Sequence, residues 1–147
     1  MPFKLADWRR LVARLGLART QVAQFRAATA EDQKTLRHLL DSAIVGLHAM
    51  AEYAINALLE LAGNPPERRH RTGDRARELR LMGHLRGDYQ QILAQLEAYR
   101  LAAQYLGYGR KPSVYYNATN VETCLHRIDE LVEETSAALR ASGQVLE

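Results

Sequence analysis

Cysteine is almost absent from this sequence, because Cys124 is the only one among 147 residues. A single thiol excludes a disulfide within the chain and a zinc cluster built from the cysteines of one chain. Cys124 stands between apolar residues at helical spacing, which favours a small buried hydrophobe over a nucleophile. We expect a reducing, cytoplasmic setting for such a chain.

Long apolar runs are lacking too. Residues 1–21 mix basic and apolar side chains, unlike the unbroken apolar segment of a signal peptide. No other stretch approaches the roughly 18 apolar residues that a membrane-spanning helix needs. The sequence therefore predicts a protein without a membrane partner.

The common sequence signatures of enzymes are missing as well. The chain has no GxxxxGK[ST] phosphate loop, no GxGxxG fingerprint, no GxSxG elbow and no HExxH zinc motif. Two histidines have a glutamate four residues away, in the pairs His48 with Glu52 and Glu122 with His126. A di-iron bundle needs Glu-x-x-His spacing on two helices, and no predicted helix carries it. We expect no metal, no cofactor and no catalytic set.

What the sequence has in abundance is arginine and helical periodicity. The net charge is +3, and 17 of the 20 basic residues are arginine, which favours anionic partners. Apolar residues recur every three or four positions in several segments. The ends of these segments carry residues that stop or cap helices. Examples are the stop at Gly63-Asn-Pro-Pro66 and a capping box at Thr119 and Glu122. The predicted helices cover residues 5–26, 29–62, 74–82, 85–106 and 119–139.

These segments predict an all-α fold with a single domain over residues 1–147. Long amphipathic helices joined by moderate turns bury their apolar faces against one another. We expect an up-and-down antiparallel helical bundle with four long helices plus one short helix.

Two basic segments are candidate binding surfaces. The first is the connector, residues 67–87, whose guanidinium groups could neutralise a nucleic-acid backbone or serve only as a solvated surface. Its candidate residues are Arg68, Arg69, Arg71, Arg75, Arg77 and His84. The second is the loop after residue 106, where tyrosines alternate with cations, as in surfaces that stack on bases or grip a partner. Tyrosines also pack loops onto bundles, so both interpretations of this loop stay open.

Two runs of residues resemble the HEPN domain family. The run His48–Gly63, followed by Pro-Pro and a basic loop that contains a histidine, resembles the second helix of HEPN domains and its exit. In the run Leu96–Tyr105, Arg100-x-x-Ala103-x-Tyr105 is similar to the family's Arg-x-x-Ala-Asp-Tyr pattern. The resemblance covers about residues 36–140, which leaves the helix at 5–26 as an addition to the HEPN-like core.

The resemblance implies a compact bundle that commonly pairs as a symmetric dimer. It also implies links to RNA cleavage, toxin–antitoxin systems and nucleotidyltransferase partners. Active members carry an arginine, four to six residues, and then a histidine. Arg100 falls where that arginine would be, but the histidine position reads Gln104 or Tyr105, and neither replaces an imidazole base. A formal match from Arg77 to His84 lies in the connector, away from the family's position.

Arg100 also has an interpretation that is independent of the family. It lies four residues after Leu96 and three before Ala103, so it borders the buried face of its helix. A guanidinium there needs a carboxylate or an anionic ligand. We favour a structural salt bridge over a ligand contact.

Three functional hypotheses follow. The leading one is a HEPN-like non-catalytic homodimer, one component of a toxin–antitoxin or nucleotidyltransferase-associated system, that binds RNA, a nucleotide or a partner protein such as a nucleotidyltransferase. One alternative is a divergent metal-independent HEPN ribonuclease that uses Arg77 with His84, or Arg100 with Tyr105 and Tyr108. Another is a purely structural protein-interaction bundle. The candidate ligand contacts of the leading hypothesis are Arg100, Tyr105, Tyr108, Arg110, Lys111 and Tyr115.

Overall fold

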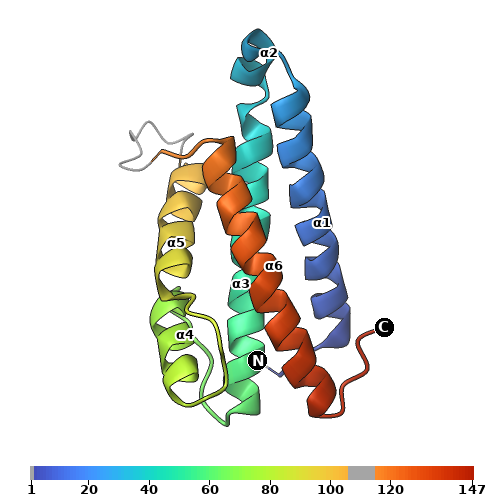
Figure 1. Ribbon diagram of the computed structural model, residues 1–147, viewed down its shortest axis with the longest axis vertical. Helices are drawn as coiled ribbons and strands as arrows, with labels where there is room; N and C mark the ends of the chain where they lie inside the picture. The colour runs from blue at the N-terminus through green and yellow to red at the C-terminus, as the bar shows by residue number, and fades with distance from the viewer. Residues whose placement is uncertain (1, 106–114) are drawn as a thin grey trace.

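The chain folds into an antiparallel bundle of helices (Figure 1). The computed structural model describes residues 2–105 and 115–147, with Tyr105 described only as the last residue of its helix. Within these ranges every regular element is a helix, which confirms the all-α prediction. The long helices are α1 (Leu5–Ala27), α3 (Arg37–Leu61), α5 (Gln90–Tyr105) and α6 (Ala118–Ala141), and the short ones are α2 (Ala30–Thr35) and α4 (Thr72–Leu81).

Helix α3 is the centre of the bundle. It packs against α1, α4, α5 and α6, and the chain runs up α1, down α3, up α5 and down α6 (Figure 1). Its side chains dominate the fully buried core, where they meet apolar residues of α5 and α6. The largest of these buried side chains are Leu40, Ile44, Leu47, Met50, Ile55, Leu58 and Leu59 from α3, Leu79 from α4, Leu93 and Leu96 from α5, and Ile128 and Leu131 from α6.

The apolar character of α3 corrects one expectation from the sequence. By length and apolar composition, α3 is one helix that could cross a membrane. In the bundle, most of it is buried against other helices. The core helix of a bundle reaches the same length and apolar content, and α3 holds that place here.

The predicted second helix is two helices. Thr29 caps α2, because its hydroxyl accepts a hydrogen bond from the Asp32 amide at 3.2 Å. The chain then bends at Leu36, which has φ −97° and ψ 9°, before α3 begins. The hydroxyl of Thr35 donates to the Asp32 carbonyl at 2.9 Å, a bond that bends helices. No residue of α2 is buried, so packing does not hold the two helices in line.

The starts of α5 and α6 also differ from prediction. Helix α5 begins at Gln90 and not at Leu85, because the Arg86 and Gly87 amides donate to the Glu134 carboxylate of α6 at 2.7 and 3.1 Å. The capping box of α6 is formed by Asn117 and Asn120, each side chain accepting from the other's amide at 2.9 Å.

The predicted capping residues of α6 bind elsewhere. Thr119 accepts a hydrogen bond from Arg26 of α1 at 3.0 Å, and Glu122 forms an ion pair with the same arginine. The prediction of a cap at Thr119 and Glu122 was therefore wrong, because both side chains hold α6 against α1.

Candidate functional site

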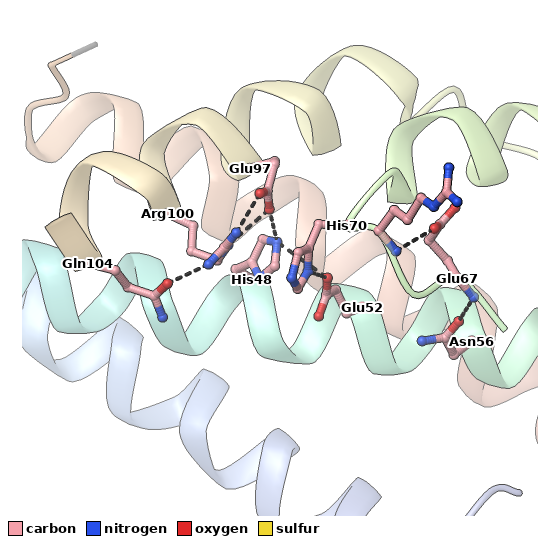
Figure 2. A network of polar contacts seen from close by, with 9 residues as sticks. His48, Glu52, Asn56, Glu67, His70, Glu97, Arg100 and Gln104 are labelled. Atoms are coloured by element: carbon pink, nitrogen blue, oxygen red, sulfur yellow. Dashed lines mark hydrogen bonds and ion pairs between the residues drawn. The ribbon is translucent and has the colours of Figure 1, made fainter. Parts of the chain in front are cut away.

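A network of polar side chains lies between the middle of α3 and the part of α5 from Glu97 to Gln104 (Figure 2). Helix α3 contributes His48 and Glu52, one turn apart. Helix α5 contributes Glu97 and Arg100, and the connector contributes His70. Segments far apart in the sequence therefore supply the network.

His70 reaches the network because the connector closes tightly onto α5. A Cβ atom on Gly73, near the start of α4, would lie 2.6 Å from the carbonyl oxygen of Gln90, so only glycine permits this approach. Thr72 beside it is 1% exposed. His70 itself has φ 60°, in the left-handed region that residues with side chains rarely adopt. Backbone strain of this kind gathers at functional sites.

Two imidazoles and two carboxylates converge at the centre of the network. His48 is 4% exposed, and its Nε2 contacts the Glu97 carboxylate and lies 3.7 Å from Glu52 Oε1. His70 Nδ1 contacts Glu52 from the other side, and the two imidazole centroids lie 5.7 Å apart. One nitrogen or oxygen atom from each of these four residues lies within 4.8 Å of the others, so together they could hold a metal ion.

Burial and charge set the protonation of the inner pair. Burial lowers the pKa of His48, against the opposing influence of Glu52 and Glu97. Burial also acts to raise the pKa of Glu97, but the hydrogen bond from Arg100 and the neighbouring His48 hold that pKa below its usual value. The site therefore combines a neutral imidazole with an ionised carboxylate near neutral pH.

Arg100 forms the structural salt bridge expected from the sequence. Its Nε and Nη2 atoms donate to the two oxygens of Glu97 at 3.0 and 2.6 Å, and its Nη1 contacts Gln104 one turn further along α5. The side chain is 12% exposed. A fork-to-fork pair of this kind fixes the direction of the carboxylate as well as its charge.

The five candidate arginines of the connector divide into one that is bonded within the protein and four that face solvent. Arg75 donates to Glu78 at 2.9 Å and to the Pro65 carbonyl at 2.9 Å, with a side chain only 15% exposed. The others are exposed, and within residues 2–105 and 115–147 no ion pair involves their guanidinium groups. These solvent-facing arginines are Arg68, Arg69, Arg71 and Arg77.

The formal pair of Arg77 and His84 is also exposed. Arg77 lies on α4, and His84 lies in the turn after it, where its amide donates to the Leu79 carbonyl at 2.8 Å. Among the contacts of the described residues, none joins the two side chains. The structure therefore places both side chains on the connector surface, without a contact between them.

Most of the second candidate segment lies outside the described residues. Tyr108, Arg110 and Lys111 belong to the part that is not described, and Tyr105 is described only as the last residue of α5. Tyr115 is 69% exposed. Tyr115 precedes α6, whereas Gly73 of the connector packs against Gln90 at the start of α5.

Tyr116, the neighbour of Tyr115, anchors the segment just before α6 to the bundle. Its hydroxyl donates to Asp41 of α3, and the guanidinium of Arg37 lies 4.6 Å from its ring centroid. Of the two tyrosines, Tyr115 is therefore the one that is accessible to a partner.

Sequence reasoning found one half of the network and missed the other. The pair of His48 with Glu52 was visible from its spacing, but His126 lies 3.1 Å from Glu130 and does not join it. The missing members are His70 and Glu97. For His70, the available signal was the turn at Gly63–Pro66. A chain that reverses its direction there runs back along α3, so the connector lies beside that helix.

The comparisons with known proteins point to one family. The family model for the HEPN domain matches residues 19–138 of this chain. Neither the curated proteins nor the solved structures contain a match. The matched range includes α3, the connector and α5, and therefore the whole polar network.

Proposed function

The chain belongs to the HEPN domain family, and we propose that it is a non-catalytic member that binds RNA through the solvent-facing arginines of its connector. The single observation that carries the proposal is the set of exposed guanidinium groups at Arg68, Arg69, Arg71 and Arg77, which form no ion pair with any described residue. Such groups are available to replace the counterions of a phosphate backbone.

The state of Arg100 supports the non-catalytic part of the proposal. In active relatives, the resemblance implies an arginine that works together with a histidine. Here the guanidinium at that position is held by both oxygens of Glu97 and contacts Gln104. In this arrangement Arg100 positions the Glu97 carboxylate, and its guanidinium charge is directed at that carboxylate and not at a scissile phosphate.

A salt series with a labelled single-stranded RNA tests the proposal. Binding through phosphates gives a logarithmic affinity that falls linearly with the logarithm of salt concentration. Each phosphate of a single strand that the protein neutralises adds about 0.7 to the steepness of that line. The double variant Arg68→Gln with Arg69→Gln neutralises two phosphates fewer and should therefore reduce the slope by about 1.4.

The matched control removes the same charge from the other side of the bundle. Arg19 and Arg26 lie in the second half of α1, where Arg19 lies 2.7 Å from Asp129 of α6 and Arg26 forms an ion pair with Glu122 of α6. Replacing both by glutamine should leave the slope unchanged. An equal reduction of the slope in the two double variants would show a response to net charge alone and would contradict a connector site.

The integrity of the RNA on a gel, followed in the same tubes, separates the other hypotheses. Cleavage that disappears on His84→Ala or Arg100→Ala would favour the ribonuclease alternative. RNA that is neither bound nor cut would favour a nucleotide, a partner protein or a purely structural bundle.

We also propose that the protein acts as a homodimer in a two-component system. The support is family membership, since the HEPN resemblance implies symmetric dimers and partners such as nucleotidyltransferases. Sedimentation equilibrium of the purified chain checks the dimer. A mass equal to one chain of 16.6 kDa at all concentrations would contradict it.

A further inference from the structure

We propose that His48, Glu52, His70 and Glu97 form a binding site for a divalent transition-metal ion, with Zn²⁺ as the preferred ion. This inference goes beyond RNA binding and does not depend on it. It concerns the interior of the polar network, whereas the proposed RNA surface concerns the outer face of the connector.

The positions of the ligand atoms carry the first part of the argument. One atom of each residue lies within 4.8 Å of the other three, and His48 Nε2 lies 3.7 Å from Glu52 Oε1. Zinc binds imidazole nitrogen and carboxylate oxygen at about 2.0 to 2.2 Å in a tetrahedron, which separates neighbouring ligand atoms by roughly 3.3 Å. Small side-chain movements convert the observed cluster into that arrangement.

The buried nitrogen of His48 is the second, independent observation. Its Nε2 atom is buried, makes an ion-pair contact with the Glu97 carboxylate, and forms no hydrogen bond of regular geometry with a described residue. Buried polar atoms without a regular hydrogen bond are rare and call for an explanation. A metal ion bound to Nε2 would give this atom a partner and would also separate it from the carboxylate.

The charges and the donor types favour zinc over other divalent ions. The two carboxylates outweigh the single guanidinium of Arg100 next to them, so the cluster attracts a cation. Mg²⁺ and Ca²⁺ prefer sites made of oxygen, whereas two imidazoles with two carboxylates suit Zn²⁺. Arg100 would serve as the outer partner that orients a ligating carboxylate.

A bound ion would join three segments of the chain. His48 and Glu52 belong to α3, Glu97 to α5, and His70 to the connector. The ion would hold the left-handed backbone of His70 in place, and with it the arginines on either side, Arg69 and Arg71. The site therefore serves to fix the connector onto the bundle.

Direct binding measurements on the full chain test the site. Protein treated with a chelator and then dialysed should bind one equivalent of Zn²⁺ by calorimetry. The Tm should rise by about 5 to 10 °C at free zinc near 100 times the Kd. Cobalt in place of zinc should give the visible absorption of a tetrahedral site. A wild-type protein that binds no stoichiometric zinc would overturn the proposal.

Variants assign the ligands. His70→Ala should weaken zinc binding by at least about 100-fold, because removal of even an outer partner costs about 10- to 100-fold. Glu52→Gln serves as the second variant and should act in the same direction. The matched control is His126→Ala, which removes an exposed histidine from another i,i+4 pair, 3.1 Å from Glu130. Equal affinity in His70→Ala, Glu52→Gln and the control would also overturn the proposal.

Discussion

Glu134 offers the sharpest test of how the connector is attached to the bundle. Its carboxylate accepts hydrogen bonds from the Arg86 amide at 2.7 Å, the Gly87 amide at 3.1 Å and the Tyr89 hydroxyl at 2.6 Å. A hydrogen bond to a charged group contributes about 1.5 to 3 kcal/mol when buried. Glu134 is half-buried and glutamine retains one acceptor oxygen, so we expect Glu134→Gln to cost about 2 kcal/mol.

Thermal and urea unfolding measure this decrease in stability. For a domain of this size, about 2 kcal/mol lowers the Tm by about 4 to 8 °C. The matched control is Glu133→Gln, since Glu133 is the exposed neighbour on the same helix and should change stability by less than about 0.5 kcal/mol. Equal stability of the two variants would refute the reasoning, because it would mean that the three hydrogen bonds contribute nothing.

The pH dependence of the same variant checks the sign of the effect. Burial acts to raise the pKa of Glu134, but the Tyr89 hydroxyl and the two amides hold it below the ordinary value of 4.5. A carboxyl whose pKa is lowered by folding stabilises the protein above that ordinary value and loses its contribution as the pH falls through the folded pKa. The difference between wild type and Glu134→Gln should therefore shrink below pH 4.5.

Three further predictions concern single side chains. Gly73→Ala should lower the free energy of unfolding by about 1 to 3 kcal/mol in urea, because its Cβ would lie 2.6 Å from the Gln90 carbonyl oxygen; an unchanged midpoint would contradict the close packing of α4 on α5. Gly16→Ala should raise the same free energy by about 0.5 to 1 kcal/mol, since α1 has open space there and alanine favours the helix. Cys124 is 1% exposed and its burial raises the pKa of the thiol to about 12, so a thiol reagent should label it only in denaturant; rapid labelling of the native protein would refute its burial.

The sequence predicted the architecture well because apolar periodicity reports directly on packing. Helix α1 was expected at residues 5–26 and spans Leu5–Ala27, and α3 ends at Leu61, just before the Gly63–Pro66 stop. The errors arose at helix ends. The hydroxyl bond of Thr35 beside Leu36 and the two reciprocal bonds of Asn117 with Asn120 set these boundaries, and periodicity does not detect them.

The candidate site was harder to predict because its parts meet only through tertiary contacts. The spacing of His48 and Glu52 was readable along one helix, and the position of Arg100 at the border of a buried face correctly indicated a salt bridge. The place of His70 depends on the close approach of Gly73 to α5 and on a left-handed backbone. Neither feature follows from local pattern, so the convergence of the four possible metal ligands was not expected.

The two proposals make a joint prediction that neither makes alone. If zinc fixes the connector, the connector is less ordered in the zinc-free protein. RNA must then order the connector when it binds, and the conformational entropy lost in this step lowers the affinity for RNA. The number of arginines that bind phosphate stays the same, and the salt slope depends only on that number. Chelation should therefore weaken RNA binding equally at every salt concentration and leave the slope unchanged. A change in slope on chelation would mean that the metal alters which arginines reach the RNA, because Arg69 and Arg71 flank the ligand His70.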